Sequence, residues 1–282
     1  MQDLTQQFQL ADGSVVGRNH VGRGNVLTGR NSQDAFCISQ EPDCIVAVVS
    51  DGCGSTPYAE FGARLLANMA CRELRFVGRS GGVDELRLAR AHSTISQHLI
   101  SIEVMMLRDL DDARQFVHDH LLATIVACIV TPTMTTIVAI GDGCFAVNDR
   151  FCSLDSFDSR PPYLAYSLLP RHDGIREESY RFSIVAQLPT DQIQNLMIGT
   201  DGVEDLRDFS HKFLPGRKSK QLGPLQQYWT EDRYFDNPIA IDRQLHLANS
   251  EHKRFSPGLG RIETHQGLLP DDTTMVVMRR AR

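Results

Sequence analysis

The sequence has no long apolar run, and no stretch approaches the roughly 20 residues that a helix needs to cross a bilayer. Its first residues have neither the basic region nor the apolar core of a secretory signal peptide. The seven cysteines include no Cys-x-x-Cys pair, and several lie within apolar runs. This usage is typical of reduced, mostly buried thiols rather than of a disulfide framework or a zinc site. We therefore expect a cytoplasmic protein that has no contact with a membrane.

Several well-known enzyme signatures are also missing. No Gly-x-Gly-x-x-Gly opens a helix, and strands do not alternate with helices, which argues against a dinucleotide-binding fold. There is no P-loop motif and no Gly-x-Ser-x-Gly nucleophile elbow. The net charge of −6 comes without a basic stripe, so nucleic acid is not an expected partner.

The sequence does contain several apolar, strand-like runs that lead into acidic residues. The run Ile45–Ser50 ends at Asp51-Gly52, and an isolated pair of this kind is most simply an ordinary turn. The pattern recurs along the whole chain, however, at Asp34, Asp142-Gly143, Asp201-Gly202 and Asp271-Asp272. Turns alone explain such a series poorly. Carboxylates gathered at one place would supply the hard oxygen ligands that Mg²⁺ or Mn²⁺ prefers.

The order of the expected elements indicates antiparallel sheets closed by a strand from the end of the chain. A hairpin is expected over 34–50, and Thr56 with Pro57 would begin a long amphipathic helix. Further helices are expected over 83–110, 203–206 and 238–250. Further strands are expected over 121–130, 134–140, 144–147, 163–168, 180–186, 193–199 and 273–278.

The ordered motifs resemble the signature series of the metal-dependent protein phosphatases, the PPM or type 2C family, and most closely its bacterial branch. The segments that carry the resemblance are Ser32–Ala35, Ser50–Gly52, Gly141–Gly143, Thr200–Val203 and Asp271–Thr274. The resemblance implies an α+β fold, a four-layer αββα sandwich of two antiparallel sheets flanked by helices. It implies one phosphatase domain over residues 1–282, in which 207–267 form a helical insertion or a flap.

The resemblance also implies hydrolysis of phosphoserine or phosphothreonine by a water that bridges two Mn²⁺ or Mg²⁺ ions. Asp51 would bridge both ions, the Gly52 carbonyl would hold one, and Asp201 with Asp271 would bind the first. Asp34 would support the second ion through its waters. Asp34, Asp51, Asp201 and Asp271 are thus the expected catalytic set. Asp142 matches the acid of a weaker third site, with a plain hairpin turn as its alternative.

Five positions depart from the family pattern or fit it loosely. Gln33 stands where many members have glutamate, although many bacterial members share the glutamine. Cys53 replaces a histidine proposed as general acid in animal members, and nothing nearby marks it clearly as a nucleophile. Arg30 and His20 are the expected phosphate contacts, and His20 is also a candidate proton donor to the leaving oxygen. Asp272 stands beside Asp271 where many members have asparagine, and we assign the metal to Asp271.

The expected partner is a phosphorylated protein, with a Ser/Thr kinase as the opposing enzyme. Two other readings stay open from the sequence. The chain could be a pseudophosphatase that serves as a regulatory binding module, or a metal-dependent phosphatase of a small phosphorylated metabolite.

Overall fold

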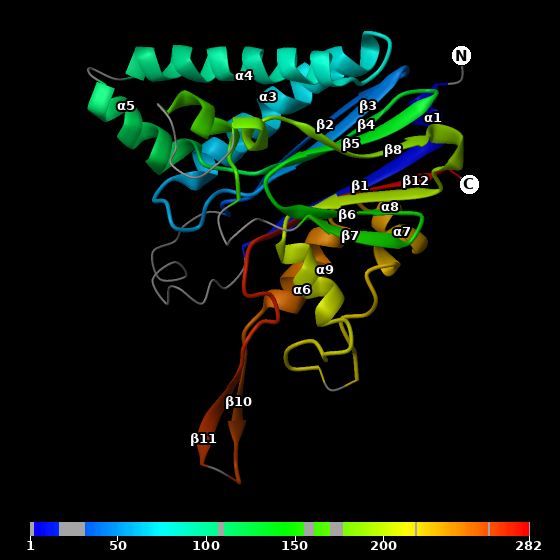
Figure 1. Cartoon of the computed structure of the whole chain (residues 1–282). Coiled ribbons are helices and arrows are strands. Elements are labelled where there is room, and N and C mark those ends of the chain that lie inside the picture. The colour runs from blue at the N-terminus through cyan, green and yellow to red at the C-terminus, as the bar shows by residue number, and fades with distance from the viewer. Residues whose placement is uncertain are drawn as a thin grey trace.

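Two five-stranded antiparallel sheets lie at the centre of the described part of the chain (Figure 1). The computed structural model describes residues 3–16, 32–106, 110–154, 161–169, 177–217, 219–258 and 260–281. The first sheet has the order β1 (Phe8–Val15), β12 (Thr273–Arg280), β9 (Asn195–Gly199), β6 (Gly143–Val147) and β7 (Arg150–Leu154). The second has the order β2 (Ala35–Glu41), β3 (Cys44–Ser50), β4 (Ile125–Val130), β5 (Met134–Ile140) and β8 (Ser183–Pro189).

Two long helices cover the outer face of the second sheet. They are α3 (Ala59–Arg79) and α4 (Glu85–Met106), followed by α5 (Leu110–Phe116) and a π-helical turn, Val117–Leu121. The buried side of α3, including Leu66 and Leu74, packs on the outward residues of β3, such as Val46 and Val48. This one-sided burial follows from the apolar stripe of α3, because such a helix must cover its stripe to be stable.

Shorter helices cover the outer face of the first sheet. They are α6 (Gly202–Asp208), α7 (Gln227–Thr230), α8 (Arg233–Asp236) and α9 (Ala240–Asn249). Their buried residues, among them Trp229 and Leu245, form one apolar cluster with sheet residues such as Met197 and Val277. A separate two-stranded hairpin, β10 (His252–Ser256) and β11 (Arg261–His265), extends away from the sheets (Figure 1).

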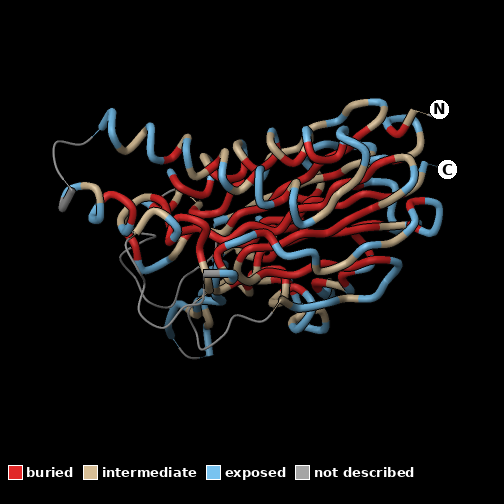
Figure 2. Tube along the Cα trace, turned by 45° about the horizontal axis from the view of Figure 1, so that its top comes forward, coloured by how far each residue is buried: buried red, intermediate tan, exposed pale blue. Residues whose placement is uncertain are grey.

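The third apolar cluster lies between the sheets. Alternate residues of β3, Ile45, Ala47 and Val49, enter it together with residues of the first sheet such as Ile198 and Val276. Both faces of the central strands are therefore buried, as Figure 2 shows by their continuous red trace. The predicted αββα sandwich is confirmed.

The remaining elements are short. A one-turn helix, α1 (Leu4–Gln7), precedes β1, and three 3₁₀ segments occur at Leu164–Leu168, Glu177–Tyr180 and Thr190–Gln192. Among the described residues, no helix combines the length and apolar character that a bilayer crossing requires. The extent of the phosphatase domain, 1–282, stays a prediction.

Three local predictions were wrong. Thr56 does not cap the first long helix, because α3 begins at Ala59 and the Thr56 hydroxyl donates to the Cys53 carbonyl at 3.0 Å. Residues 163–168 are not a strand: Leu164–Leu168 are 3₁₀-helical, and neighbouring tyrosine rings pack edge to face. The expected strand over 121–130 begins only at Ile125, since the π-helical turn runs to Leu121.

Candidate metal and phosphate site

The site is built at one edge of the two facing sheets, starting from Asp34 and Asp51. Asp34 immediately precedes β2 and Asp51 immediately follows β3, and these strands pair so that Ala35 lies opposite Ser50. The pairing of neighbouring antiparallel strands therefore brings the two carboxyl-bearing residues together. The backbone after β3 is held further, because the Asp51 carbonyl accepts from Thr124 N at 2.8 Å and Gly52 N donates to Gln33 O at 3.1 Å.

The first sheet contributes its acids in the same way. Asp201 follows β9 and opens α6, while Asp271 and Asp272 precede β12. Strands β9 and β12 pair with Gly199 opposite Met275. Acids 70 and 71 positions apart in the sequence thereby meet at adjacent strand ends.

Two glycines permit close backbone packing here. A Cβ on Gly202 would lie 2.1 Å from the Asp272 carbonyl oxygen, and one on Gly52 would lie 2.7 Å from the Gln33 carbonyl oxygen. Such distances leave no room for any side chain. The glycine in each of these two Asp-Gly pairs is thus required by the backbone atoms packed against it.

Thr200 joins the two sheets at the site. Its hydroxyl donates to Oδ2 of Asp34 at 2.8 Å, and it accepts from the Thr274 amide at 3.0 Å. Asp34 belongs to the strand pair of the second sheet, whereas Thr200 and Thr274 belong to the first. The contact fixes the Asp34 carboxyl group relative to Asp201, the next residue along the chain.

The carboxyl groups raise one another's pKa values. The pKa of Asp51 is well above its ordinary value, first through desolvation and then through Asp34, Asp201 and Asp271. Desolvation and Asp272 raise the pKa of Asp34 to about 7, and desolvation, Asp271 and Asp142 raise that of Asp201 to about 7. This mutual repulsion is the electrostatic cost of gathering carboxylates without a cation.

Asp271 and Asp272 face different neighbours. Asp271 is exposed and acts on Asp51, Asp201 and Asp205, all through charge repulsion that raises their pKa values. Asp272 is buried and its Oδ2 accepts from the Gln33 amide at 2.6 Å. Asp271 is thus the acid of the pair that acts on the other carboxyl groups, whereas Asp272 holds the backbone at Gln33. The assignment of a metal ion to Asp271 stays a prediction.

Asp142 lies on the connection between the sheets. Its neighbours β5 and β6 belong to different sheets, so the alternative reading of this Asp-Gly as a hairpin turn was wrong. Asp142 raises the pKa of Asp201 and also acts on Tyr163, which places it beside the other acids.

The outer part of the site is an acidic groove of about 410 Å³. It is lined by Asp201, Gly202, Glu204, Asp205, Asp208, Pro270 and Asp271. Asp205 and Thr200 had not been predicted as site residues. Asp205 lies one helical turn after Asp201 in α6, and desolvation together with Asp271 raises its pKa to about 6. The spacing of four residues from Asp201 was a usable signal, whereas Thr200 becomes notable only through its contact with Asp34.

We tested whether these residues fit divalent cations. In the described ranges, no three His, Cys, Asp or Glu side chains form a group spaced as a complete metal site. The donor chemistry nevertheless fits: all the gathered side chains offer oxygen, which suits Mg²⁺ and Mn²⁺. In addition, Oδ1 of Asp34 is buried without a hydrogen-bond partner among the described residues. A cation would satisfy that oxygen and offset the repulsion, so the residues fit such an ion.

The remaining predicted residues are divided between described and undescribed parts of the chain. Arg30 and His20, the expected phosphate contacts, lie outside the described residues. Cys53 lies next to the acids, with its sulfur 3.2 Å from the Ser55 hydroxyl oxygen.

Comparison with known proteins shows the family of this chain. The model of the protein phosphatase 2C family matches residues 16–230, so the chain belongs to the protein phosphatase 2C family and the predicted resemblance is confirmed. A search of curated proteins finds no match.

Solved structures share the fold at low identity. A structure described as a bacterial serine phosphatase superposes with a TM-score of 0.52 at 13% identity, covering 96% of this chain and 97% of that chain. The structure of PppA, described as a key regulatory component of T6SS in Pseudomonas aeruginosa, gives 0.50 at 17% identity and covers 98% of each chain.

Proposed function

We propose that this protein is a metal-dependent phosphatase of phosphoserine and phosphothreonine in proteins. The observation that carries the proposal is the electrostatic coupling of Asp34, Asp51, Asp201 and Asp271, which come from both sheets. Membership of the protein phosphatase 2C family supports the same chemistry.

Each acid has a distinct part in the proposal. Asp51, whose pKa is raised by both Asp34 and Asp201, would be shared by two cations, with the Gly52 carbonyl as a further oxygen. Asp201 and Asp271 would hold the first cation, Asp34 would support the second, and Asp142 would hold a weaker third. Bound Mn²⁺ or Mg²⁺ would activate water for attack and neutralise charge on the phosphoryl group.

Residues around the acids hold the carboxyl groups in place for that chemistry. Thr200 keeps the Asp34 carboxyl group in place through a 2.8 Å hydrogen bond, and Gly202, the residue after Asp201, packs closely against the Asp272 backbone. The open acidic groove leaves room for a phosphorylated side chain on a polypeptide. A Ser/Thr kinase that phosphorylates the partner protein would produce the substrate of this phosphatase.

The test is hydrolysis of p-nitrophenyl phosphate and of a phosphothreonine peptide with Mn²⁺, with Mg²⁺ and with EDTA. We expect turnover to depend on the metal. Asp51→Asn and Asp201→Asn should each lower it more than about 100-fold, because each removes a negatively charged ligand. Changes to residues that only support a metal ligand already lower activity about 10- to 100-fold.

Asp191→Asn is the matched control, because Asp191 is exposed in the 3₁₀ turn Thr190–Gln192 and belongs to no acidic cluster described above. It should leave turnover unchanged. The proposal would be contradicted if turnover were unchanged in both Asp51→Asn and Asp201→Asn. It would also be contradicted if the unmodified protein showed no turnover with Mn²⁺ and none with Mg²⁺.

A further inference from the structure

Charge is distributed unevenly along this chain. Residues 207–267 contain ten Lys and Arg against seven Asp and Glu, whereas the remainder contains 19 against 28. All four lysines of the protein lie in this segment, at Lys212, Lys218, Lys220 and Lys253. A cationic segment within an anionic chain attracts ligands that the rest of the surface repels.

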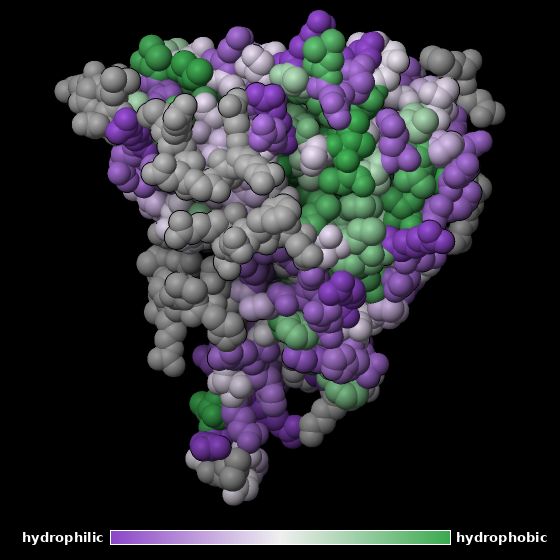
Figure 3. Space-filling model, in the orientation of Figure 1, coloured by the Kyte–Doolittle hydropathy of each residue, from purple (hydrophilic) through white to green (hydrophobic). Residues whose placement is uncertain are grey.

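A cavity of about 1000 Å³ lies in this cationic segment, between the loop 213–217 and the hairpin of β10 and β11. Its basic lining residues are Arg217, His252, Arg254 and His265. Glu263 lies opposite Arg254 in the strand register, yet neither Arg217 nor Arg254 forms an ion pair within the described part of the chain. Hydrophilic residues dominate the hairpin end of the face in Figure 3.

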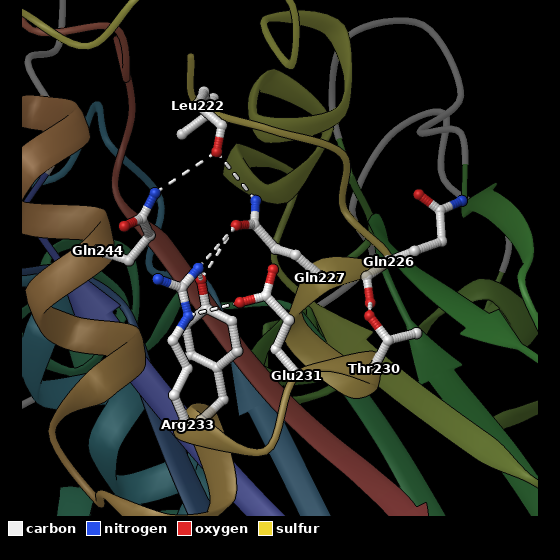
Figure 4. Close-up of polar contacts among 8 residues, drawn as sticks. Leu222, Gln226, Gln227, Thr230, Glu231, Arg233 and Gln244 are labelled. Atoms are coloured by element: carbon white, nitrogen blue, oxygen red, sulfur yellow. Dashed lines mark hydrogen bonds and ion pairs between the residues drawn. The ribbon is translucent and has the colours of Figure 1, made fainter. Parts of the chain in front are cut away.

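The loop that carries Arg217 is held at its base. Leu214 N donates to Lys220 O and Leu222 N donates to Lys212 O, both at 2.9 Å, and the Leu214 side chain is buried. The Leu222 carbonyl in turn accepts from Gln227 at 2.9 Å and from Gln244 at 3.4 Å (Figure 4). These contacts tie the loop to α7 and α9, so Arg217 projects from an ordered support.

A second network stiffens the support itself. Nη2 of Arg233 donates to Oε1 of Gln227 at 3.3 Å and to the Tyr234 hydroxyl at 2.8 Å, while Nε of Arg233 pairs with Glu231 at 2.7 Å (Figure 4). The Tyr234 hydroxyl donates to the same Gln227 oxygen at 3.0 Å. The Arg233 charge is therefore used within the support, unlike those of Arg217 and Arg254.

The hairpin is packed against the same loop. Gly216 has a φ of +71°, and a Cβ there would lie 2.4 Å from Cδ2 of His252. Only glycine accommodates both the backbone conformation and the ring. The His252 ring therefore rests on the loop backbone, and this contact closes one side of the cavity.

The cavity is adjacent to the acidic groove along the chain. Leu268 lines the cavity and Asp271 lines the groove, and three residues span at most about 11 Å. A polypeptide whose phosphorylated residue enters the groove can therefore reach the cavity with residues a short distance away.

We propose that this cavity docks an acidic stretch of the phosphoprotein substrate. The inference rests on the proposed function and names the substrate class of that same site. Arg217 and Arg254 would bind Asp or Glu side chains, since guanidinium groups pair with carboxylates through two hydrogen bonds. The acidic groove repels the carboxylates of such a stretch. They would therefore bind in the cavity, while the phosphorylated residue binds in the groove.

The test compares two phosphothreonine peptides that differ only in flanking residues, one set being glutamates and the other serines. We expect the full chain to have a higher kcat/KM for the glutamate peptide. The double variant Arg217→Gln/Arg254→Gln should lower that value about tenfold, mostly through KM, because each lost charge-assisted bond weakens binding. The serine peptide and p-nitrophenyl phosphate should be hydrolysed as before.

Lys253→Gln is the matched control, because Lys253 is on the same hairpin beside Arg254 and is already paired with Glu251 at 2.9 Å. It should preserve the preference for the glutamate peptide. Equal kcat/KM for both peptides in the unmodified protein, or an equal loss on both in the double variant, would overturn the docking site.

A third peptide, with a second phosphothreonine in place of the glutamates, separates the two possible sources of negative charge. Preference for it without any preference for glutamates would also overturn an acidic-stretch site. If a variant hydrolyses p-nitrophenyl phosphate as the unmodified protein does, the variant is folded. If the unmodified protein does not hydrolyse p-nitrophenyl phosphate, that result counts against the phosphatase function and not against the docking site.

Discussion

Thr200 illustrates how a single hydroxyl group organises the site. It is buried, donates to Asp34 and accepts from the Thr274 amide, so it connects the acid of one sheet to the end strands of the other. The residue next to it, Asp201, takes its orientation from the same segment.

We expect Thr200→Val to destabilise the protein by about 1–3 kcal/mol. Valine has the shape of threonine but lacks the hydroxyl group, so the buried Asp34 carboxyl group and Thr274 amide lose their hydrogen-bond partner. It should also weaken metal-dependent turnover, since the Asp34 carboxyl group loses its fixed position. Urea unfolding and a Mn²⁺ titration of turnover measure the two effects. Thr200→Ser, which retains the hydroxyl, should restore both; failure of this rescue would show that the methyl group, not the hydrogen bond, matters.

At the scale of elements, the site depends on how closely strand ends and helix starts approach. The start of α6 lies against the residues that lead into β12, with Gly202 at the point of contact. An apolar cluster that includes Val203 and Leu206 holds α6 on the first sheet. The helix thus cannot retreat to make room for a side chain at its first residue.

Gly202→Ala should therefore be strongly destabilising, since its Cβ would meet the Asp272 carbonyl oxygen at 2.1 Å and the backbone must shift. We expect a loss of at least about 1–3 kcal/mol, the range for overpacking a filled site, with loss of turnover. Thermal unfolding and p-nitrophenyl phosphate hydrolysis check this.

Gly258→Ala is the control for this prediction, because a Cβ at Gly258 meets nothing within 4 Å. Its melting temperature should stay close to that of the unmodified protein. Equal stability of Gly202→Ala and Gly258→Ala would disprove the tight contact at α6.

At the scale of the whole molecule, the gathered acids couple metal binding to stability. The folded-state pKa values of Asp34 and Asp201, about 7, lie above the ordinary aspartate value of 3.8. The folded protein thus binds protons that the unfolded chain has released. Stability from this source is present below the unfolded pKa and is lost as pH rises through the folded pKa.

Without metal, the melting temperature should consequently fall between about pH 5 and pH 8. Saturating Mn²⁺ should raise it more at the higher pH, where the ion no longer competes with protons. Thermal unfolding in EDTA and in Mn²⁺ across this range measures both trends. The variant Asp34→Asn/Asp201→Asn should show a smaller fall in EDTA and little gain from Mn²⁺; an identical pH profile in this variant would assign the effect to other groups.

The fold class could be predicted from the sequence, and the acids that we propose as metal ligands could be picked out there too. Apolar runs such as Ile45–Ser50 can be satisfied only by burial, and recurrent acids at their ends must leave the core together. The order of these motifs carried the family resemblance, and the resemblance in turn implied the sandwich. Local chemistry was less decisive at helix starts, where Thr56 had the properties of a cap but bonds to Cys53 instead.

How these parts meet became visible in the three-dimensional structure. It separated β5 from β6, placed Asp272 under Gln33 and Asp271 toward Asp51, and brought Thr200 to Asp34. It also set the loop of Arg217 beside the distant hairpin of Arg254. These contacts join residues far apart in the chain, and their geometry arises from the packing of whole sheets and helices, which no local pattern encodes.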